Sequence, residues 1–439
     1  MVLHLSISVF LEQLVTPKGS SMIKADRNRF TKNSGMLLAM NAAKILFPLI
    51  TLPYLTRVLS TDAYGTVVYV KSVISYMQLM VDFGFLLSAT KEIVNANGDT
   101  VLQSKIVSNV LASKLILAGA SFIVLAVFTF VLPILRRQPV YALLSFLPVV
   151  LSIFLFDFLF RGLEKMEVIT LRFVIMRGIT TMLTFFFIHS DVDLLKIPLL
   201  DTVGSLAAIV MIARQLKAQN IQLCKPKRAE VSRELKSSSV YFLSSIASTS
   251  LNALNTLVMG LLLTTTEIAY WGVCMQAVAA VQAVYTPISD SLYPIMIKKR
   301  QMKLVCTIAT CAFPVITCTC VAAYFLSDFG IVLIGGAEYL PAAATFRLLI
   351  PVLFFSFFAL LFGWPALGAI DRNLLVSKTT VLSVMFDVVG MVILIALHCY
   401  TLRNVTILRS CTEVVLWLSR FLSFLRCRAE FVDYKEKCP

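Results

Sequence analysis

Long apolar runs dominate the chain, and short polar segments separate them. A membrane-spanning helix needs roughly 20 apolar residues, and the longest runs all approach or exceed that length. We assign twelve of them, at residues 36–56, 66–88, 106–133, 139–160, 167–188, 194–213, 238–262, 268–296, 304–326, 346–369, 375–397 and 402–425. Several contain proline, which membrane helices tolerate because neighbouring helices re-satisfy the freed backbone groups. The pattern predicts an all-α, polytopic membrane protein with about twelve transmembrane helices.

The composition excludes a soluble globular protein. Of the 439 residues, 58% are apolar and only 14% are charged, and the mean hydropathy is +0.86. Soluble domains are about half apolar and a quarter charged. Because the apolar runs and their connections use most of the chain, no room remains for a separate soluble catalytic domain.

The chain holds 39 Lys and Arg against 24 Asp and Glu, and the excess is unevenly distributed. Most basic residues fall in every second connection, whereas the other connections hold few of them; the pair Arg136 and Arg137 is the main exception. Basic residues accumulate in cytoplasmic loops. We therefore expect both termini to lie in the cytoplasm, and the charge excess needs no nucleic-acid partner.

The longest basic connection, residues 214–237, separates two sets of six predicted helices. We expect a cytoplasmic basic tail at 1–35, an N-lobe at 36–213, the connection at 214–237, a C-lobe at 238–425 and a cytoplasmic tail at 426–439. Met22 precedes a basic cluster and is an alternative start, so residues 1–21 are a candidate upstream extension. The segment after helix one (LSTDAYG, 59–65) resembles the segment after helix seven (LTTTEIAY, 263–270). Parallel repeats of this kind are a transporter architecture.

Ionisable residues inside apolar runs are the candidate functional residues, because a charge at the membrane centre costs about 3 kcal/mol on insertion scales. The cations are Lys44, Lys71, Lys114, Arg172, Arg177, Lys378 and Arg409, and the acids are Asp82, Asp157, Asp201, Asp290 and Asp387. Snorkelling to the interface is the alternative for those nearer to helix ends, namely Lys71, Lys114, Lys378, Asp82, Asp157 and Arg409. The excess of cations favours an anionic substrate over a cationic one.

Two predicted helices carry amides at helical spacing. Asn41, Lys44 and Pro48 share one face of helix one, and Asn252 and Asn255 share a face of helix seven, its counterpart in the second half. We expect these faces to line a cavity between the halves, with polar contacts between helices as the alternative.

Motifs of other function classes are missing from the sequence. It has no G-x-x-x-x-G-K-[ST] loop for ATP, no H-E-x-x-H zinc site, no G-x-S-x-G elbow and no Cys-x-x-Cys pair among its ten cysteines. We therefore expect a transporter and not an enzyme, with no cofactor or metal. A proton or sodium gradient is the candidate energy source.

The chain contains the segments LPYLTRVLS (52–60), AYG (63–65), VDFGF (81–85) and SATKEI (88–93), followed by Tyr293-Pro294 and GAEY (336–339). These segments resemble bacterial O-antigen and polysaccharide flippases of the multidrug/oligosaccharidyl-lipid/polysaccharide exporter superfamily. The resemblance covers residues 36–370, and the Arg-bearing twelfth helix departs from the pattern. It implies a MATE-like fold of two six-helix lobes that moves an undecaprenyl-diphosphate-linked oligosaccharide to the periplasmic leaflet.

The resemblance also assigns roles to the candidate residues. Lys44, Arg172 and Arg177 would contact the diphosphate, and Asn41, Asn252 and Asn255 the sugars. Asp82, Asp201 and Asp387 would be the candidates for ion coupling. Expected partners are the lipid-linked substrate, the bilayer, a polysaccharide polymerase and a chain-length regulator. The alternatives are a multidrug cation antiporter, a peptidoglycan-precursor flippase and, from a different class, a polysaccharide polymerase.

Overall fold

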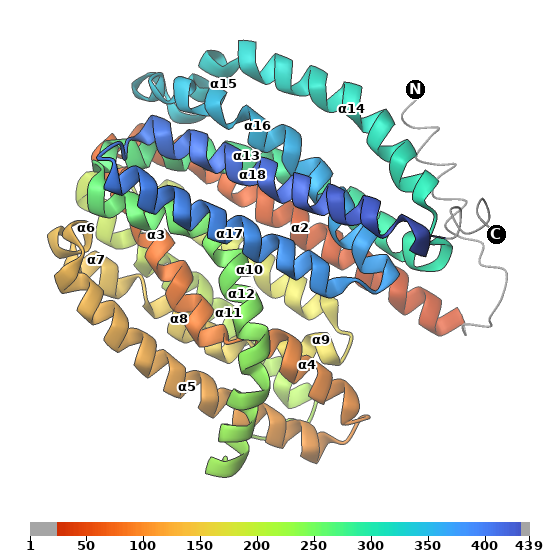
Figure 1. Cartoon of the computed structure of the whole chain (residues 1–439). Helices are drawn as coiled ribbons and strands as arrows, with labels where there is room; N and C mark the ends of the chain where they lie inside the picture. Colours follow the sequence, from red (N-terminus) through yellow and green to blue (C-terminus); the bar gives the residue numbers. More distant parts are fainter. Residues whose placement is uncertain (1–23, 432–439) are drawn as a thin grey trace.

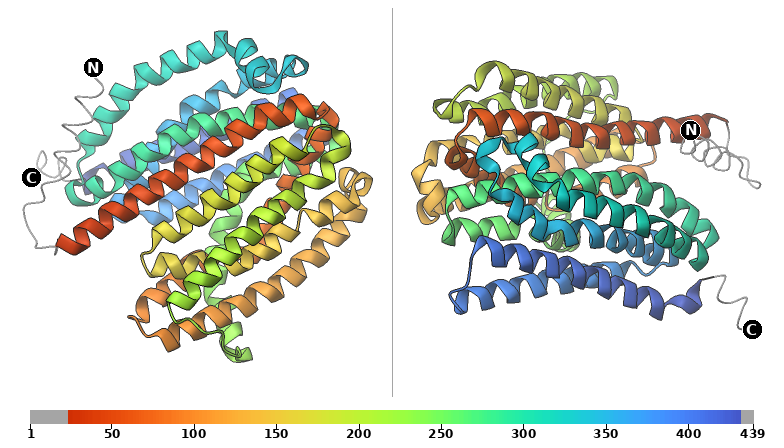
Figure 2. Two further views of the ribbon diagram at one scale, coloured as in Figure 1. Left: turned by 180° about the vertical axis from the view of Figure 1, so that it is seen from behind. Right: turned by 90° about the horizontal axis from the view of Figure 1, so that it is seen from above.

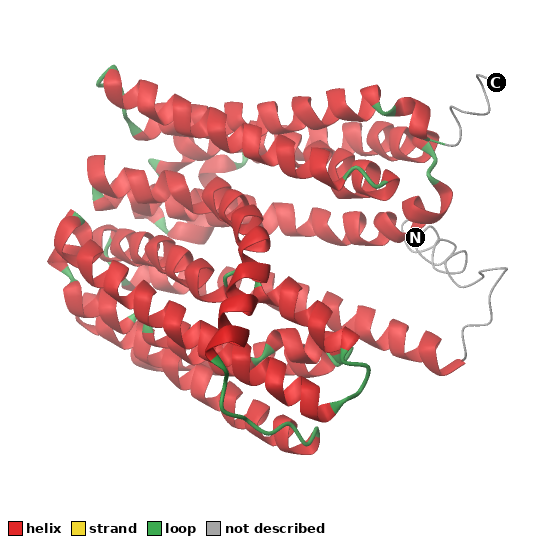
Figure 3. Ribbon diagram, turned by 60° about the horizontal axis from the view of Figure 1, so that its bottom comes forward, coloured by secondary structure: helices red, strands yellow, loops and turns green. Residues whose placement is uncertain are grey.

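The computed structural model describes residues 24–431, and this part consists of helices and their connections without a β-strand (Figure 3). The candidate extension at 1–21 lies outside the described residues, as does most of the predicted tail at 426–439. The expectation of an all-α chain is confirmed for the part that the structure describes.

The first half of the chain, which we call the N-lobe, ends before the basic connection. It comprises α2 (Lys24–Val58), α3 (Thr61–Asp82), α4 (Phe85–Asn95), α5 (Thr100–Val131), α6 (Pro133–Arg137), α7 (Pro139–Leu144), α8 (Leu147–Ser152), η1 (Ile153–Leu155), α9 (Asp157–Gly162), α10 (Met166–Phe187), η2 (Asp191–Leu195) and α11 (Lys196–Ala218). Helix one begins earlier than predicted and includes part of the basic tail. The predicted fourth helix is divided among α7, α8, η1 and α9.

The second half, the C-lobe, contains seven α-helices and several short helical turns. They are α12 (Arg228–Leu262), α13 (Thr265–Lys299), α14 (Met302–Phe325), α15 (Ser327–Gly335), η3 (Ala337–Tyr339), α16 (Ala342–Leu361), η4 (Phe362–Leu367), η5 (Gly368–Ile370), α17 (Asn373–Ala396), α18 (Leu402–Arg426) and η6 (Arg428–Glu430). Thr264 caps α13 through a reciprocal capping box with Glu267.

Ten helical segments among the described residues are long and apolar enough to cross a membrane. Two predicted spans are not among them. One is α12, in which the described residues give a shorter apolar stretch at Ala253–Leu262, and the other is α18, which carries Arg409, Glu413 and Arg420. The protein is a multi-pass membrane protein. The predicted count of twelve spans is not confirmed.

The helices form two groups that run roughly side by side (Figure 1). Helix α2 lies between the groups, with α10 on one side and α13 and α15 on the other (Figure 2). Helix α12 crosses the other helices steeply in Figure 1, and it contacts α3, α4 and α5 of the N-lobe as well as α17 and α13 of its own lobe. Although α12 opens the C-lobe in sequence, it therefore bridges the two groups.

We call the end of the bundle that holds the α4–α5 turn and the α11–α12 connection the basic end, because most loop cations lie there. At the opposite end the lobes are in direct contact. The Arg57 guanidinium donates to the Leu333 carbonyl at 2.7 Å, Thr56 donates to the Ile334 carbonyl at 3.1 Å, and Thr265 hydrogen-bonds Asp62. These bonds join α2 and α3 to α15 and α13.

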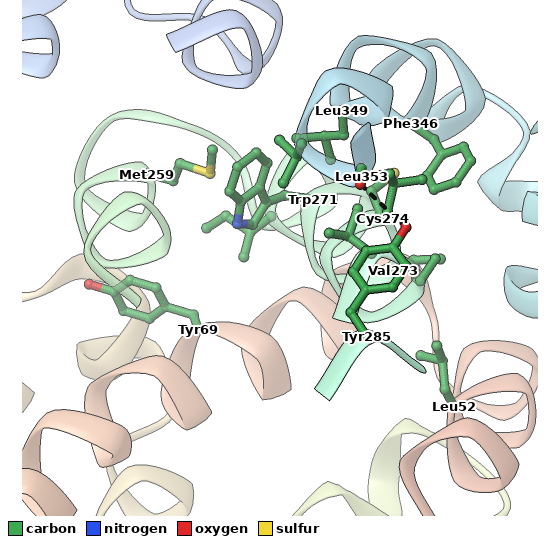
Figure 4. Packing of buried hydrophobic residues seen from close by; sticks show 14 of the residues in the cluster. Leu52, Tyr69, Met259, Trp271, Val273, Cys274, Tyr285, Phe346, Leu349 and Leu353 are labelled. Atoms are coloured by element: carbon green, nitrogen blue, oxygen red, sulfur yellow. Dashed lines mark hydrogen bonds between the residues drawn. The ribbon is translucent and has the colours of Figure 1, made fainter. Parts of the chain in front are cut away.

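Close approach of backbones supports the same contact. A Cβ atom on Gly65 of α3 would lie 1.9 Å from the Thr265 carbonyl oxygen, and one on Gly260 of α12 would lie 1.9 Å from the Tyr69 ring. Tyr69, Met259 and Trp271 are fully buried there (Figure 4). Only glycine allows the helices of the two lobes to approach this closely. The two glycines therefore permit direct contact between the lobes at the end opposite the basic end.

Candidate functional site

A pocket of about 220 Å³ lies between α2 of the N-lobe and α13 of the C-lobe. Its α2 wall contains Asn41 and Lys44, two of the residues predicted to face a cavity. Its α13 wall consists of small or uncharged side chains, Gln276, Ala279, Ala280, Ala283 and Thr286. Alanines leave space, and the amide and hydroxyl groups can hydrogen-bond an occupant. The pocket thus places one ammonium opposite a neutral, partly polar wall.

Lys44 is exposed in this pocket, and it forms no ion pair with the acids that the structure describes. Its ammonium lies 5.9 Å from the centre of the Phe173 ring on α10, at the outer range of a cation–π contact. Asp157, Arg161 and Arg172 are the charged groups that act on it from nearby. An accessible ammonium without a dedicated carboxylate is available to an anionic ligand.

Arg172 of α10 acts on Lys44 from nearby but does not line the pocket. Its guanidinium is buried and donates to the Asp157 carboxylate at 2.7 Å. A neighbouring pair joins Lys114 of α5 to Asp82 at 2.8 Å, and Gln78 also donates to Asp82 at 2.8 Å. Lys114 and Asp82 both act on Asp157, so the two pairs form one charged cluster inside the N-lobe.

Arg177 lies further along α10, and it pairs with Asp201 of α11 at 3.3 Å. Both side chains remain partly exposed. Lys71 of α3 interacts with both members of this pair. Arg177 is therefore less free than Lys44 to contact a ligand, and Asp201 is already held between two cations.

Lys71 lies near the middle of α3, about 15 Å from the start of the helix at 1.5 Å per residue. It is therefore further from the helix end than the sequence interpretation placed it, and its side chain is exposed. Lys71, Ser75, Gln78 and Asp82 recur every three or four residues and share one face of α3. That spacing could have identified a polar face, but the predicted start of the helix at 66 placed Lys71 too near its end.

Asp387 lies in a second polar cluster, inside the C-lobe. Its carboxylate is 1% exposed and accepts hydrogen bonds from the Asn255 amide at 2.9 Å and from the Thr412 hydroxyl at 3.0 Å. Arg409 also acts on it, although that guanidinium is paired with Glu413 at 2.8 Å. The Asn255 side-chain oxygen is buried without a hydrogen-bond partner among the described residues.

The position of Asn255 differs from the expectation that helix seven would line the cavity with helix one. The pocket is completed by α13 instead, and Asn255 faces Asp387 of α17. The side chain of Asn252 lies outside the described residues. The spacing of Asn252 and Asn255 predicts that they share a face of the helix, but it does not predict which helix that face contacts. The buried Asp387 carboxylate requires hydrogen-bond donors, and Asn255 supplies one.

Two curated relatives are similar to this chain. A putative O-antigen transporter of Escherichia coli (strain K12) is 26% identical over 265 residues, and one of Shigella dysenteriae is 28% identical over 272 residues. Each match covers 60% of this chain, but only 64% and 66% of the respective relative. The likeness thus extends over just under two thirds of these relatives.

Comparison with solved structures gives the fold. A structure titled as the inward-facing conformation of a multidrug resistance MATE family transporter of the MOP superfamily aligns with a TM-score of 0.70. The alignment covers 90% of this chain and 96% of that one at 15% identity, so it shows a shared MATE-like fold alone. The family model described as polysaccharide biosynthesis protein matches residues 30–299, and with more than half of its length matched, this chain belongs to that family.

Proposed function

We propose that the protein is a flippase that moves an undecaprenyl-diphosphate-linked oligosaccharide, an O-antigen or capsule repeat unit, from the cytoplasmic to the periplasmic leaflet of the bacterial inner membrane. The basic end would face the cytoplasm, where loop cations accumulate. Membership of a polysaccharide biosynthesis family and the MATE-like fold support the proposal. A polysaccharide polymerase and a chain-length regulator would act on the product.

One observation carries the proposal: an ammonium without an ion-pair partner among the described acids, that of Lys44, faces a pocket between the two lobes. The difficult part of flipping is the diphosphate and sugar, which cannot enter about 30 Å of hydrocarbon, while the lipid tail can remain in the bilayer. Lys44 would pair with the diphosphate, since charge-assisted bonds to phosphate are strong. Asn41, Gln276 and Thr286 would hydrogen-bond the adjoining sugar.

The position of the pocket explains how access could alternate. Its two walls belong to different lobes, so relative movement of the lobes changes its opening. The bonds of Arg57 with Leu333 and of Asp62 with Thr265 hold the lobes together at the opposite end in this state. The described conformation would therefore receive substrate from the basic end, and separation of these contacts would release it on the other side.

Among the predicted coupling residues, Asp387 suits the role better than Asp82 or Asp201. The latter two are neutralised by Lys114 and Arg177. Asp387 has only neutral hydrogen-bond donors, Asn255 and Thr412, while Arg409 is engaged by Glu413. A buried carboxylate without a dedicated cation is suited to bind and release a proton or a sodium ion, with the free Asn255 oxygen as a further cation ligand.

Asp387→Asn is expected to make transport insensitive to ion gradients, because an amide keeps the volume but cannot ionise. Transport of lipid-linked sugar into proteoliposomes would be measured with and without proton and sodium gradients. Asp328→Asn is a matched control, since Asp328 pairs with Arg347 near the opposite end and is exposed. Unchanged gradient dependence in Asp387→Asn would exclude the coupling role.

Deletion of the gene tests the function itself. We expect loss of surface polysaccharide and accumulation of lipid-linked repeat units in the inner leaflet, detected by protection from an external sugar-modifying enzyme. A polymerase defect would instead leave single repeat units on the outer side. Wild-type surface polysaccharide in the deletion strain would refute the proposal.

A further inference from the structure

The first half of α12 is attached to the N-lobe by side chains that recur every fourth residue. The Asn109 amide of α5 donates to Glu230 at 2.9 Å, and the hydroxyls of Ser238 and Ser88 lie 2.6 Å apart. The Phe242 and Phe83 rings stack with centres 4.4 Å apart. Residues at this spacing form one face of a helix, so a single stripe of α12 meets α5, α4 and the α3–α4 bend.

The bend itself is shaped to receive α12. Gly84 has a φ of 82°, which favours glycine, and a Cβ atom there would lie 2.6 Å from Tyr241 and 2.9 Å from the Phe242 backbone nitrogen. On α4, the residues that follow at helical spacing are Ser88 and Glu92. The two helices therefore run antiparallel with facing ridges of every fourth residue.

Glu234 occupies the position of the stripe between Glu230 and Ser238, and it faces Glu92. The residue is 1% exposed, Glu92 is the acid that acts on it most strongly, and its Oε2 atom has no hydrogen-bond partner among the described residues. Two carboxyl groups can share a hydrogen bond only if one of them carries a proton. A direct bond between Glu92 and Glu234 therefore needs a proton.

The other charged groups around Glu234 change its pKa, but Glu234 still binds a proton more tightly than a free glutamate does. Burial and the hydrogen bond with Glu92 raise the pKa of Glu234 to about 8, Arg233 lowers it, and Glu230 raises it further. From α5, the uncharged amide of Asn109 bonds this stripe at Glu230. Glu92 and Glu234 lie just outside the apolar runs predicted at 66–88 and 238–262, at the basic end.

We propose that Glu92 and Glu234 form a proton-dependent clasp that holds α12 against the N-lobe at the basic end. When both carboxylates are ionised, like charges in a buried contact repel each other and release the first half of α12. The same helix carries Asn255, which bonds Asp387 deeper in the C-lobe. The clasp therefore links the pH at the basic end to the lobe arrangement, and its role in transport, though not its existence, rests on the proposed function.

The direction of the pH effect follows from linkage. A free glutamate has a pKa near 4.5 and the docked Glu234 one of about 8, so docking takes up a proton between these values. The proton-linked stabilisation of the docked state is fully present below pH 4.5 and is lost as the pH rises through 8. The docking constant is expected to fall as the pH rises from 6 to 9, by at most about tenfold per pH unit.

Cysteine cross-linking measures docking without any substrate. Ser88→Cys with Ser238→Cys places two thiols where the hydroxyls are 2.6 Å apart, and disulfide formation is followed in membrane vesicles at pH 6 to 9. The same pair in a Glu234→Gln background is the reference at each pH, so that the ionisation of the thiols cancels. The two single-cysteine variants correct for native cysteines.

We expect equal cross-linking of parent and Glu234→Gln at pH 6, and a severalfold deficit of the parent at pH 9. Glu230→Gln, one turn away on the same helix, should retain the pH dependence of the parent. A parent-to-Gln ratio that stays constant from pH 6 to 9, or an equal effect of Glu230→Gln, would overturn the clasp. Neither result depends on whether the protein flips lipid-linked sugars, which the gene deletion decides separately.

Discussion

Lys44→Ala is expected to abolish polysaccharide export while the protein still reaches the membrane at its normal level. The ammonium is exposed in the inter-lobe pocket and forms no ion pair with the acids described, so no partner is left unpaired in the fold. A charge-assisted hydrogen bond contributes about 1.5–3 kcal/mol, which corresponds to roughly 10- to 150-fold in affinity for the headgroup. Surface polysaccharide and protein level would be measured together in a complemented deletion strain.

Two variants separate charge from shape at this position. Lys44→Arg keeps the charge and should retain measurable export. Lys378→Ala removes another exposed lysine from an apolar helix, but outside the pocket, and should leave export unchanged. Normal surface polysaccharide in Lys44→Ala would show that the diphosphate does not depend on this residue.

Gly65→Leu is expected to prevent closure at the end opposite the basic end and to stop transport. Even a Cβ atom at this position would lie 1.9 Å from the Thr265 carbonyl oxygen, which belongs to backbone and cannot rotate away. Helices α3 and α13 must then separate, breaking the contact between Asp62 and Thr265. Disulfide formation between Asp62→Cys and Thr265→Cys, compared with and without Gly65→Leu, reports this separation directly.

Gly119→Leu is the matched control for this experiment. Gly119 lies within α5, and a Cβ atom there meets nothing within 4 Å. The variant should cross-link and export as the parent does. If Gly65→Leu cross-linked as fast as the control, the lobes would not need to meet at this glycine, and the sealed end would not be part of the transport cycle.

The sequence predicted the position of a candidate site residue correctly where that residue has no ion-pair partner from another helix among the described residues. Lys44 and Asn41 share a face of α2, and the structure places both in one pocket. Arg172 and Arg177 were predicted as ligands by the same reasoning, yet each has an acid within 3.3 Å that comes from another segment. Contacts between helices determine which cation has an acidic partner. The spacing of residues along one helix does not predict those contacts.

The clasp shows a similar division. Glu92 and Glu234 are far apart in the sequence and lie in the connections between predicted helices. Nothing in the sequence alone indicates that they come together. The structure brings them together because Gly84 bends α3 away from α4 and admits α12 beside it. Gly84 thus allows α12 to reach Glu92, which lies about two turns further along α4.

By itself, the sequence determined that the chain is helical, crosses a membrane many times and carries most of its loop cations at one end of the helices, because hydrophobic length and charge are properties of single segments. Only the tertiary structure decided that α13 and not α12 completes the pocket with α2, that Asn255 donates to Asp387, and that Lys44 forms no ion pair with the acids described. Those outcomes depend on which faces meet when helices distant in sequence approach, and burial then requires each charge to find a partner or to remain open to a ligand.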